Sequence, residues 1–514
     1  MSSTDDRDSF TIGASGGDEV VVPWPLVRRV RRRASAALRP RAEPVGGRRH
    51  RWWVLWTVLA GLFSVNVTFT IFAVALTNVA HGFHVSLADI TWVITAPLLF
   101  FGIAAPVLGK LGDMWGHRRL YLVGTAVAVV CALATAAAPT VGSLIAVRAL
   151  SGVDGAAAGA ASMALIFRVF EHEDRVKAMG WWSLVGAGGP VIGVVVGGVL
   201  IQAFGWRALF LAQAPITLAA LVVAFVVLPE TERAEAQAFD WWGAATLTVS
   251  VSALLWGLNR GPVMGWSAPV VVGGFVVVPL AAAGFVAAER RAQAPLLPLG
   301  FLRRRNFSFP MGNQLFANFA YMGGFILAPA LLERVYRYSV AGAGVMVIAR
   351  PLAFSLTAPV AGYLAGRIGD RVSAASGSVV LLGSMLVFAA VGRSSAAVWV
   401  LVALALSGVG LGLSSPSTAA AVANSVDEAN LGVASAAQQL VAQVGVVAGI
   451  QVMQTVQAAR QSSAGLVGSF HDSYVVGALV SVLAVVCGLG MAGRRRSFDL
   501  GVAPLGSKSA MAEA

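Results

Sequence analysis

Three charged side chains stand inside long apolar runs of this sequence: Arg148, Asp154 and Arg350. If those runs cross a membrane, each charge costs about 2.5–3.5 kcal/mol at the centre of its helix on insertion scales. A residue retained at that cost is a functional candidate by default. Asp154 is the clearest acid, and a carboxyl in such a place can bind and release a proton. We therefore take Asp154 and Arg148 as candidates for proton coupling.

Arg148 and Asp154 are predicted to lie on different faces of one helix. At about 100° per residue, Arg148 shares a stripe with Gly152, Gly155 and Gly159, and Asp154 lies about 120° from that stripe. Three interpretations of Asp154 stay open. It could carry a proton, form a structural ion pair with Arg148 or Arg350, or face water without a function.

Uncharged polar side chains in the apolar runs are candidates for lining a cavity, although such residues also form packing hydrogen bonds. Together with Arg350 and Tyr321, they are Asn66, Thr68, Asn313, Gln314 and Asn318.

Enzyme chemistry finds little support, and we expect neither a cofactor nor a metal. Gly109-Lys110 lacks the leading glycine and the following Ser or Thr of a phosphate-binding loop, so ATP is not expected to drive the protein. His81 and His84 have no matching carboxylates or cysteines and are expected at the surface. Cys131 and Cys487 stand alone in apolar runs and are expected to pack there.

The composition excludes a water-soluble globule. Of 514 residues, 57% are hydrophobic and 12% are charged, and the mean hydropathy is +0.77. The net charge of +13 does not indicate nucleic-acid binding, because most basic residues stand in the first 51 residues or in short connections between apolar runs. Membrane topology and contact with anionic lipids explain it better. The chain is predicted to be an all-α, multi-pass membrane protein.

We count fourteen apolar segments of about the 20 residues that a membrane-spanning helix needs. Their approximate bounds are 52–76, 90–109, 119–138, 142–166, 180–202, 207–228, 240–259, 268–288, 308–332, 342–366, 374–392, 396–422, 431–457 and 473–492. Loops after even-numbered segments carry more than twice as many Lys and Arg residues as the opposite loops. By the positive-inside rule, both termini are therefore predicted to be cytoplasmic, in the cell (inner) membrane.

An internal repeat predicts two halves. Residues 149–153 (ALSGV) recur letter for letter at 405–409, and the glycine-rich stretch that begins at Gly109 recurs in part at Gly362. The chain then divides into a disordered basic cytoplasmic arm (1–51), an N-terminal six-helix half (52–228), an inserted helix pair (229–300), a C-terminal six-helix half (301–492) and a cytoplasmic tail (493–514).

The loop between the second and third segments resembles the signature loop of the major facilitator superfamily. It reads GKLGDMWGHRR over residues 109–119, and the residues that carry the resemblance are Gly109, Asp113, Gly116, Arg118 and Arg119. The glycines allow two helix ends to approach closely, and Asp113 can accept hydrogen bonds near a helix N-terminus. The resemblance implies a gating role for this loop.

Further motifs are similar to those of the fourteen-helix drug:proton antiporter family. Arg148 with Gly152 looks like the fourth-helix motif. The antiporter motif is matched by Gly189, Pro190, Gly193, Gly197 and Gly198. Other matches are Trp206, Arg207, Phe210, Leu211, Pro215, Asp240, Trp241, Gly243, Gly265 and Trp266. One departure is the first segment, where Asn66, Thr68 and Thr70 precede 74–76 (VAL) and the family's usual acid is missing.

The resemblance implies a major facilitator fold and a secondary transporter, not an enzyme. It would export a hydrophobic or amphipathic small molecule, of drug or antibiotic type, by alternating access, with H⁺ as coupling ion and as a monomer. Two alternatives stay open: an exporter of a lipid, siderophore or endogenous natural product, and a membrane sensor or scaffold that transports nothing. The positive charge of the two buried arginines against one acid predicts a cavity that prefers neutral or anionic ligands.

Overall fold

The computed structural model describes residues 9–13, 19–23, 47–85, 90, 92–230, 240–292, 295–392 and 395–492. Some helical residues within these ranges are described by their backbone alone, among them Thr68, Pro190, Gly197 and Gly198. The chain forms two compact units, Met1–Trp52 and Trp53–Ala514.

Two short strands occur in the first unit, where the sequence predicts a disordered arm. Strand β1 (Ser9–Gly13) pairs antiparallel with β2 (Glu19–Pro23), with Thr11 opposite Val21. Apolar residues alternate along β1, and β2 contains three consecutive valines, a residue type that favours β structure. The arm prediction is therefore wrong for these residues, and the rest of the arm before α2 lies outside the described part of the chain.

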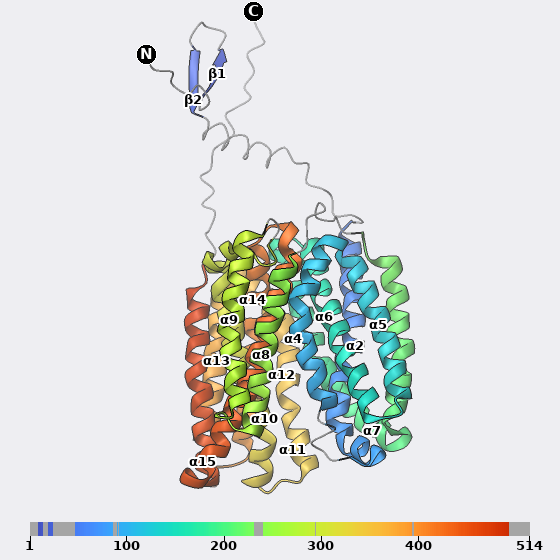
Figure 1. Cartoon of the computed structure of the whole chain (residues 1–514). Coiled ribbons are helices and arrows are strands. Elements are labelled where there is room, and N and C mark those ends of the chain that lie inside the picture. The colour runs from blue at the N-terminus through green and yellow to red at the C-terminus, as the bar shows by residue number, and fades with distance from the viewer. Residues whose placement is uncertain are drawn as a thin grey trace, which may run out of the picture. The chain divides into compact units, whose positions relative to one another are not determined.

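Long helices make up the second unit and run alongside one another as a bundle (Figure 1). In chain order the helices are α2 (Gly47–Phe83), α4 (Trp92–Trp115), α5 (His117–Ala137), α6 (Val141–Val169), α7 (His172–Val227), α8 (Trp241–Met264), α9 (Pro269–Arg291), α10 (Arg305–Arg334), α11 (Val340–Val347), α12 (Ala349–Ile368), α13 (Asp370–Ala390), α14 (Val398–Asn424) and α15 (Leu431–Gly490), with short 3-10 turns η1 (Leu299–Arg303) and η2 (Glu428–Asn430). Within the described residues, 11 helices are long and apolar enough to cross a membrane. The protein is thus a multi-pass membrane protein.

Two of these helices are each two passes joined at a glycine. Helix α7 has 56 residues and would measure about 84 Å if straight, far more than the ~30 Å of a bilayer core. It turns back at Gly205 (φ 77°), and α15 turns back at Gly465 (φ 72°). Both angles lie in the left-handed region that glycine adopts without strain. With each limb counted as a pass, the helices correspond one to one with the fourteen predicted segments, α11 and α12 together forming the tenth.

The repeated sequence makes equivalent contacts in the two places where it occurs. A Cβ at Gly152 in α6 would lie 2.2 Å from the Pro97 carbonyl oxygen in α4, and a Cβ at Gly408 in α14 would lie 2.2 Å from the Arg350 carbonyl oxygen in α12. Each glycine therefore allows its helix to approach a neighbour closely. The pairs α4/α6 and α12/α14 pack by the same small-residue contact.

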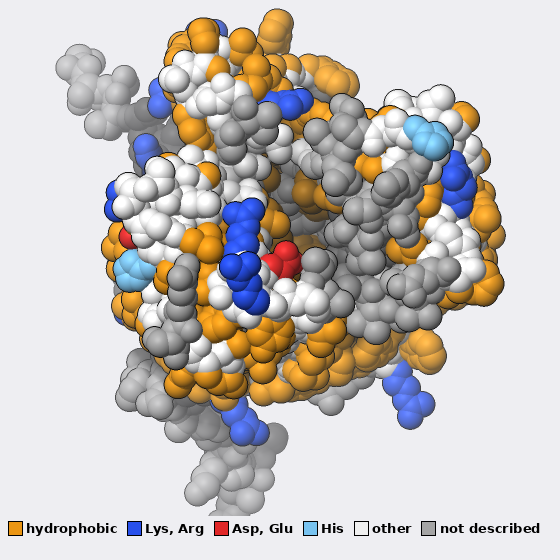
Figure 2. Space-filling model, turned by 90° about the horizontal axis from the view of Figure 1, so that it is seen from below, with side chains coloured by type: hydrophobic (Ala, Val, Ile, Leu, Met, Phe, Trp, Pro, Cys, Tyr) orange, Lys and Arg blue, Asp and Glu red, His pale blue; other side chains and the backbone are white. Residues whose placement is uncertain are grey.

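The bundle has two ends, which we name by a residue at each. The Asp113 end carries the last turn of α4, the start of α7, the last turn of α12 and the start of α15. The Gly205 end carries the two turns at Gly205 and Gly465. Figure 2 views the Gly205 end, which is hollowed near its centre.

Candidate functional site

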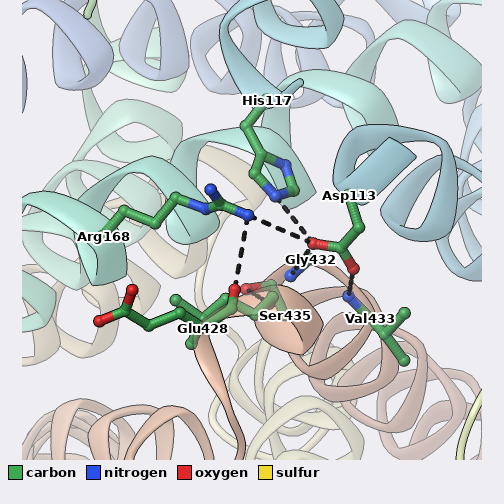
Figure 3. Close-up of polar contacts among 8 residues, drawn as sticks. Asp113, His117, Arg168, Glu428, Gly432, Val433 and Ser435 are labelled. Atoms are coloured by element: carbon green, nitrogen blue, oxygen red, sulfur yellow. Dashed lines mark hydrogen bonds and ion pairs between the residues drawn. The ribbon is translucent and has the colours of Figure 1, made fainter. Parts of the chain in front are cut away.

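Asp113 binds the beginning of α15 (Figure 3). It lies in the last turn of α4 and is 2% exposed. Its Oδ1 accepts a hydrogen bond from the Gly432 backbone N–H at 3.0 Å, and its Oδ2 accepts one from Val433 at 2.9 Å. The first N–H groups of a helix have no partner within the helix, and the helix dipole favours an anion there. Asp113, which lies far from α15 in the sequence, therefore caps the start of this helix.

Two basic side chains complete this cluster. His117 Nε2 lies 3.0 Å from Asp113 Oδ1, and an Arg168 guanidinium nitrogen lies 3.9 Å from the same oxygen. Arg168 also donates to the Glu428 carbonyl oxygen at 3.4 Å. A Cβ at Gly432 would lie 2.4 Å from the His117 ring and 2.6 Å from Asp113 Oδ1, so the close approach requires a glycine. Helices α4, α5 and α6 together thus hold the start of α15.

A second interface closes the same end between α7 and α12. A Cβ at Gly362 would lie 2.7 Å from the Val176 carbonyl oxygen, and one at Gly180 would lie 2.6 Å from the Ala358 carbonyl oxygen. Both glycines allow backbone to meet backbone. Since α4 meets α15 and α7 meets α12, the Asp113 end is closed by two helix pairs.

The remaining residues of the predicted gating loop have other positions. Gly109 packs on α15, where its Cβ would lie 2.8 Å from the Gly432 carbonyl oxygen. Gly116 has a φ of 99° and allows the sharp turn from α4 into α5. Arg118 pairs with Glu230 and donates to the Phe225 carbonyl oxygen at 2.6 Å, at the end of α7. Arg119 is exposed.

A cavity of about 350 Å³, which we name the central cavity, lies between helices of both repeats. Helices α2, α4, α6 and α7 line one side, and α10, α12, α14 and α15 line the other. Among the described residues, its polar lining consists of amides, one indole and two hydroxyls: Asn66, Trp182, Ser183, Gln314, Asn318, Ser415, Gln439 and Gln443. The remaining lining is apolar or glycine. A lining of this kind suits an amphipathic molecule that offers hydrogen-bonding groups.

The predicted cavity residues divide into three groups. Asn66, Gln314 and Asn318 line the central cavity. Asn313 does not, because its side-chain amide donates to Ser378 Oγ and to the Ala484 carbonyl oxygen, each at 2.7 Å. The Thr68 side chain lies outside the described part. Asn313 therefore joins α10 to α13 and α15, which is the packing alternative.

Arg350 also lies away from the lining of the central cavity. It is fully buried, and its guanidinium carbon lies 3.5 Å from the Tyr321 ring centre and 5.0 Å from that of Phe325. None of its three guanidinium nitrogens has a hydrogen-bond acceptor among the described residues. Cation–π contacts stabilise the charge in place of an ion pair. Two side chains separate it from the cavity, since Arg350 contacts Tyr321, and Tyr321 packs edge-on at 5.9 Å against Phe354, which lines the cavity.

Arg148 and Asp154 line one small cavity of about 20 Å³ between α2, α5, α6 and α7. The two side chains have different neighbours, since Arg148 Nε donates to the Val93 carbonyl oxygen in α4 at 3.4 Å and Asp154 meets Cys131 of α5, yet both line this cavity. Both are buried, at 3% and 4% exposed. The Cys131 thiol contacts the Asp154 carboxyl, whereas Asp154 Oδ2 has no hydrogen-bond partner among the described residues. The arrangement allows the Asp154 carboxyl to bind and release a proton beside Arg148.

Sequence reasoning missed two features of this small cavity. Gln213 in α7 lines it, and its Oε1 is a buried acceptor without a partner in the described part. Val65 in α2 lines both the small cavity and the central cavity, so one side chain lies between them. A glutamine within an apolar run was the only signal in the sequence, and it did not indicate which helix Gln213 would face.

The antiporter motif lies in the first limb of α7. Gly189 and Gly193 are buried there, and for Pro190, Gly197 and Gly198 only the backbone is described. Neighbouring glycines show what this stretch contacts. Gly186 lines the central cavity, and a Cβ at Gly188 would lie 3.2 Å from Ser355 Oγ in α12. The stretch thus packs between the cavity and α12.

The chain is similar to known transporters. Residues 58–450 match the Major Facilitator Superfamily. The "Tetracenomycin C resistance and export protein" of Streptomyces glaucescens is 32% identical over 81% of this chain and 78% of its own length. The "Multidrug resistance protein Stp" of Mycobacterium tuberculosis is 29% identical over 78% and 75%. A solved structure of a proton:xylose symporter superposes with a TM-score of 0.63 at 13% identity, over 85% of this chain and 94% of the other.

Proposed function

Because the chain belongs to the Major Facilitator Superfamily, we propose that it is a secondary transporter that exports drug-like or antibiotic-like amphipathic small molecules. The observation that carries this proposal is the central cavity between the helices of the two repeats, closed at the Asp113 end by α4 on α15 and by α7 on α12. A cavity shared by two repeats is where alternating access places a substrate. The names of these relatives, which concern antibiotic and multidrug resistance and export, support the substrate class.

The export cycle then follows from the two closed helix pairs. The halves, residues 52–228 and 301–492, would rock about the central cavity, and the inserted pair, 229–300, would lie beside them. We place the protein in the inner membrane of the cell, with both termini in the cytoplasm. The Asp113 end then faces the cytoplasm. The present structure would be the state closed toward the cytoplasm, after substrate has been carried outward. A single chain contains all these parts, which supports a monomer.

Proton coupling is assigned to Asp154 and Arg148. A buried carboxyl beside a guanidinium changes its protonation when the distance between them or the access of water changes. Val65 and α6 connect this small cavity to the central cavity, where Gly155 and Gly159 of the same helix line the wall. A substrate that displaces α6 would therefore alter the surroundings of Asp154.

Contact with anionic lipid is supported at the Asp113 end. An open groove of about 540 Å³ between α7 and α12 is lined by Lys177, Arg367 and Tyr363, with exposed apolar side chains beside them. Two cations next to apolar surface suit an anionic headgroup and its acyl chains.

Flux in proteoliposomes tests the function. The purified chain is reconstituted, and uptake of a fluorescent amphiphile into inside-out oriented vesicles is measured with and without an imposed pH gradient. We expect uptake to accelerate when the vesicle lumen is acidic and to collapse when a protonophore is added. Uptake that equals the rate of protein-free vesicles in both conditions would refute transport, and uptake that ignores the gradient would refute proton coupling alone.

A further inference from the structure

A second cavity, which we name the side pocket, lies between α8 of the inserted helix pair and helices α4, α10 and α15. Its volume is about 260 Å³, close to the lower limit of about 300 Å³ for typical ligand pockets. Residues from all four helices line it, among them Trp92, Leu99, Trp256, Asn259, Ile450 and Gln454. The inserted pair therefore supplies one wall of a cavity instead of only flanking the bundle.

One layer of side chains separates the side pocket from the central cavity. Val446 of α15 lines both. Gln443, which lines the central cavity, donates from its side-chain amide to the carbonyl oxygen of Leu98, which lines the side pocket, at 3.4 Å. A bond of that length is at the weak end of hydrogen bonding, so a rotation of Gln443 would connect the two spaces at small cost.

The side pocket is closed toward the Asp113 end and partly open elsewhere. At Gly102 a Cβ would lie 2.8 Å from Leu255 and 3.5 Å from Gln443, so α4, α8 and α15 meet there. Ile326 of α10 lines the pocket and is 38% exposed. The pocket is therefore not sealed around Ile326.

The lining defines the chemistry of the occupant. Two indole rings offer flat apolar surfaces, and Asn259, Gln451 and Gln454 offer amide donors and acceptors. No charged residue is among those that line the pocket in the described part, and the Arg260 cation lies over the ring of the lining residue Trp92 at 4.6 Å. These features favour a planar aromatic molecule with carbonyl or carboxylate groups and disfavour a cation.

We propose that the side pocket is a second binding site for a planar aromatic, neutral or anionic amphiphile, which passes through it between the central cavity and the membrane. The inference rests on the proposed export function for its direction. Binding at the pocket itself does not depend on transport, so the two are tested separately.

Binding stoichiometry gives the first test. The full chain is placed in phosphatidylcholine nanodiscs, and bound 9-anthracenecarboxylate is measured by equilibrium dialysis against empty nanodiscs. We expect two molecules per wild-type chain and one for Leu99→Trp, which fills the side pocket, with the remaining site unchanged. Leu280→Trp is the matched control, because Leu280 lies on the inserted helix α9 and is 67% exposed; it should keep both. Two molecules bound to Leu99→Trp, or one to wild type, would overturn the second site.

Further variants keep this test decisive. Should Leu99→Trp fold poorly, Trp256→Ala removes one stacking surface without adding volume and should weaken one of the two sites about tenfold. The matched cation 9-aminoacridine should bind the side pocket more weakly than the anion, and the opposite order would contradict the assigned chemistry. The fluorescence of Trp256 is obtained as the difference between wild type and Trp256→Phe. If brominated phosphatidylcholine quenches this fluorescence, an acyl chain occupies the pocket, and the pocket is not a substrate site.

Flux of the same probe tests the passage. Leu99→Trp should reduce pH-gradient-driven flux at least about tenfold, while Leu280→Trp leaves it unchanged. Loss of the second bound molecule with full flux would overturn the passage. Two-site binding without any driven flux in wild type would instead refute the proposed export function and leave the pocket in place.

Discussion

At the scale of single residues, the buried charges lie outside the lining of the central cavity. Asp154 shares its small cavity with Arg148, Cys131 and Gln213 and does not line the central cavity. Arg350 lies behind Phe354 and Tyr321, with aromatic rings in place of an anion. A proton site beside the substrate cavity permits coupling without direct contact, and a buried cation two side chains from the cavity can favour anionic ligands.

Asp154→Asn should abolish pH-driven transport and leave substrate exchange without a gradient largely intact. The amide keeps the size of the carboxyl but cannot exchange a proton. Driven flux should fall at least about a hundredfold, in the range that loss of an essential proton-transfer group produces. The loss is measured as flux with and without a pH gradient in the same vesicles. Asp472→Asn is the control, because Asp472 is a carboxylate that pairs with Arg460 near the Gly205 end. Wild-type driven flux in Asp154→Asn would contradict the assignment.

Arg350→Gln should weaken anionic ligands more than neutral ones. Attraction between a buried cation and an anion in a medium of low dielectric is poorly screened, so we expect an anionic amphiphile to lose about tenfold in affinity and its uncharged amide analogue about twofold or less. Competition binding with this matched pair measures the difference. Equal losses for both ligands would indicate that Arg350 only stabilises the packing of α10 on α12.

At the scale of helices, close approach depends on glycines and one carboxylate. Asp113 caps α15 from α4, whereas the position 253 residues later is Gly366, which cannot cap the start of α7. The two closing interfaces are therefore chemically unequal although the repeats are related. The α4–α15 interface depends on charge, and the α7–α12 interface depends on backbone packing.

Asp113→Asn should damage cycling more than substrate affinity. A helix cap contributes about 0.5–2 kcal/mol, so its loss would shift the balance between closed and open Asp113 ends by a factor of about 2–30. We expect flux to fall by such a factor while the dissociation constant measured at the central cavity changes by less than about threefold. Glu230→Gln, which removes the partner of Arg118, is the control outside the cap. If affinity and flux fell together, Asp113 would not act as a gate.

Gly152→Ala and Gly408→Ala should destabilise the protein, because each new Cβ would lie 2.2 Å from a carbonyl oxygen of the neighbouring helix. Overpacking of this kind costs about 1–3 kcal/mol. Gly383→Ala in α13 is the matched control, since nothing lies within 4 Å of its Cβ position. Thermal unfolding in detergent should show a lower Tm for the first two and an equal or higher Tm for the control. Unchanged Tm values for both repeat glycines would refute the close contacts.

At the scale of the whole molecule, the closed Asp113 end and the hollowed Gly205 end (Figure 2) give the bundle a direction. Charge at the connections relates that direction to the membrane, because loops rich in Arg and Lys stay in the cytoplasm. The arginines of the Asp113 end include Arg118, Arg168 and Arg175. These charges predict that the Asp113 end faces the cytoplasm, and labelling can test this orientation.

Cysteine labelling should locate the two ends. Leu302 near the Asp113 end and Trp399 near the Gly205 end are similarly exposed, at 50% and 52%. In a background of Cys131→Ser and Cys487→Ser, Trp399→Cys should react with a membrane-impermeant maleimide in intact cells, or in spheroplasts if an outer layer excludes the reagent. Leu302→Cys should react only after lysis. The reverse pattern would invert the topology and, with it, the assigned direction of transport.

The sequence by itself located the passes of this protein and pointed to the loop of residues 109–119. Hydrocarbon thickness sets the length of an apolar run, so the fourteen segments could be located without a structure. Gly109 and Asp113 could be identified because a close helix contact and a helix cap each require a particular residue type. The hairpin of β1 and β2 was missed, because it is short and stands in a polar, glycine-containing stretch.

Only the tertiary structure decided which faces of the helices meet. Membrane helices are apolar on nearly all sides, because lipid and protein interior are alike to a Leu side chain, so the pattern of apolar residues does not indicate the buried face. That is why Asn318 lines the central cavity and Asn313, five residues earlier, joins three helices instead. It is also why Gln213 and the side pocket were not foreseen. Their positions depend on how α7 packs against α5 and α6 and how α8 packs against α4, which is fixed by contacts between residues far apart in the chain.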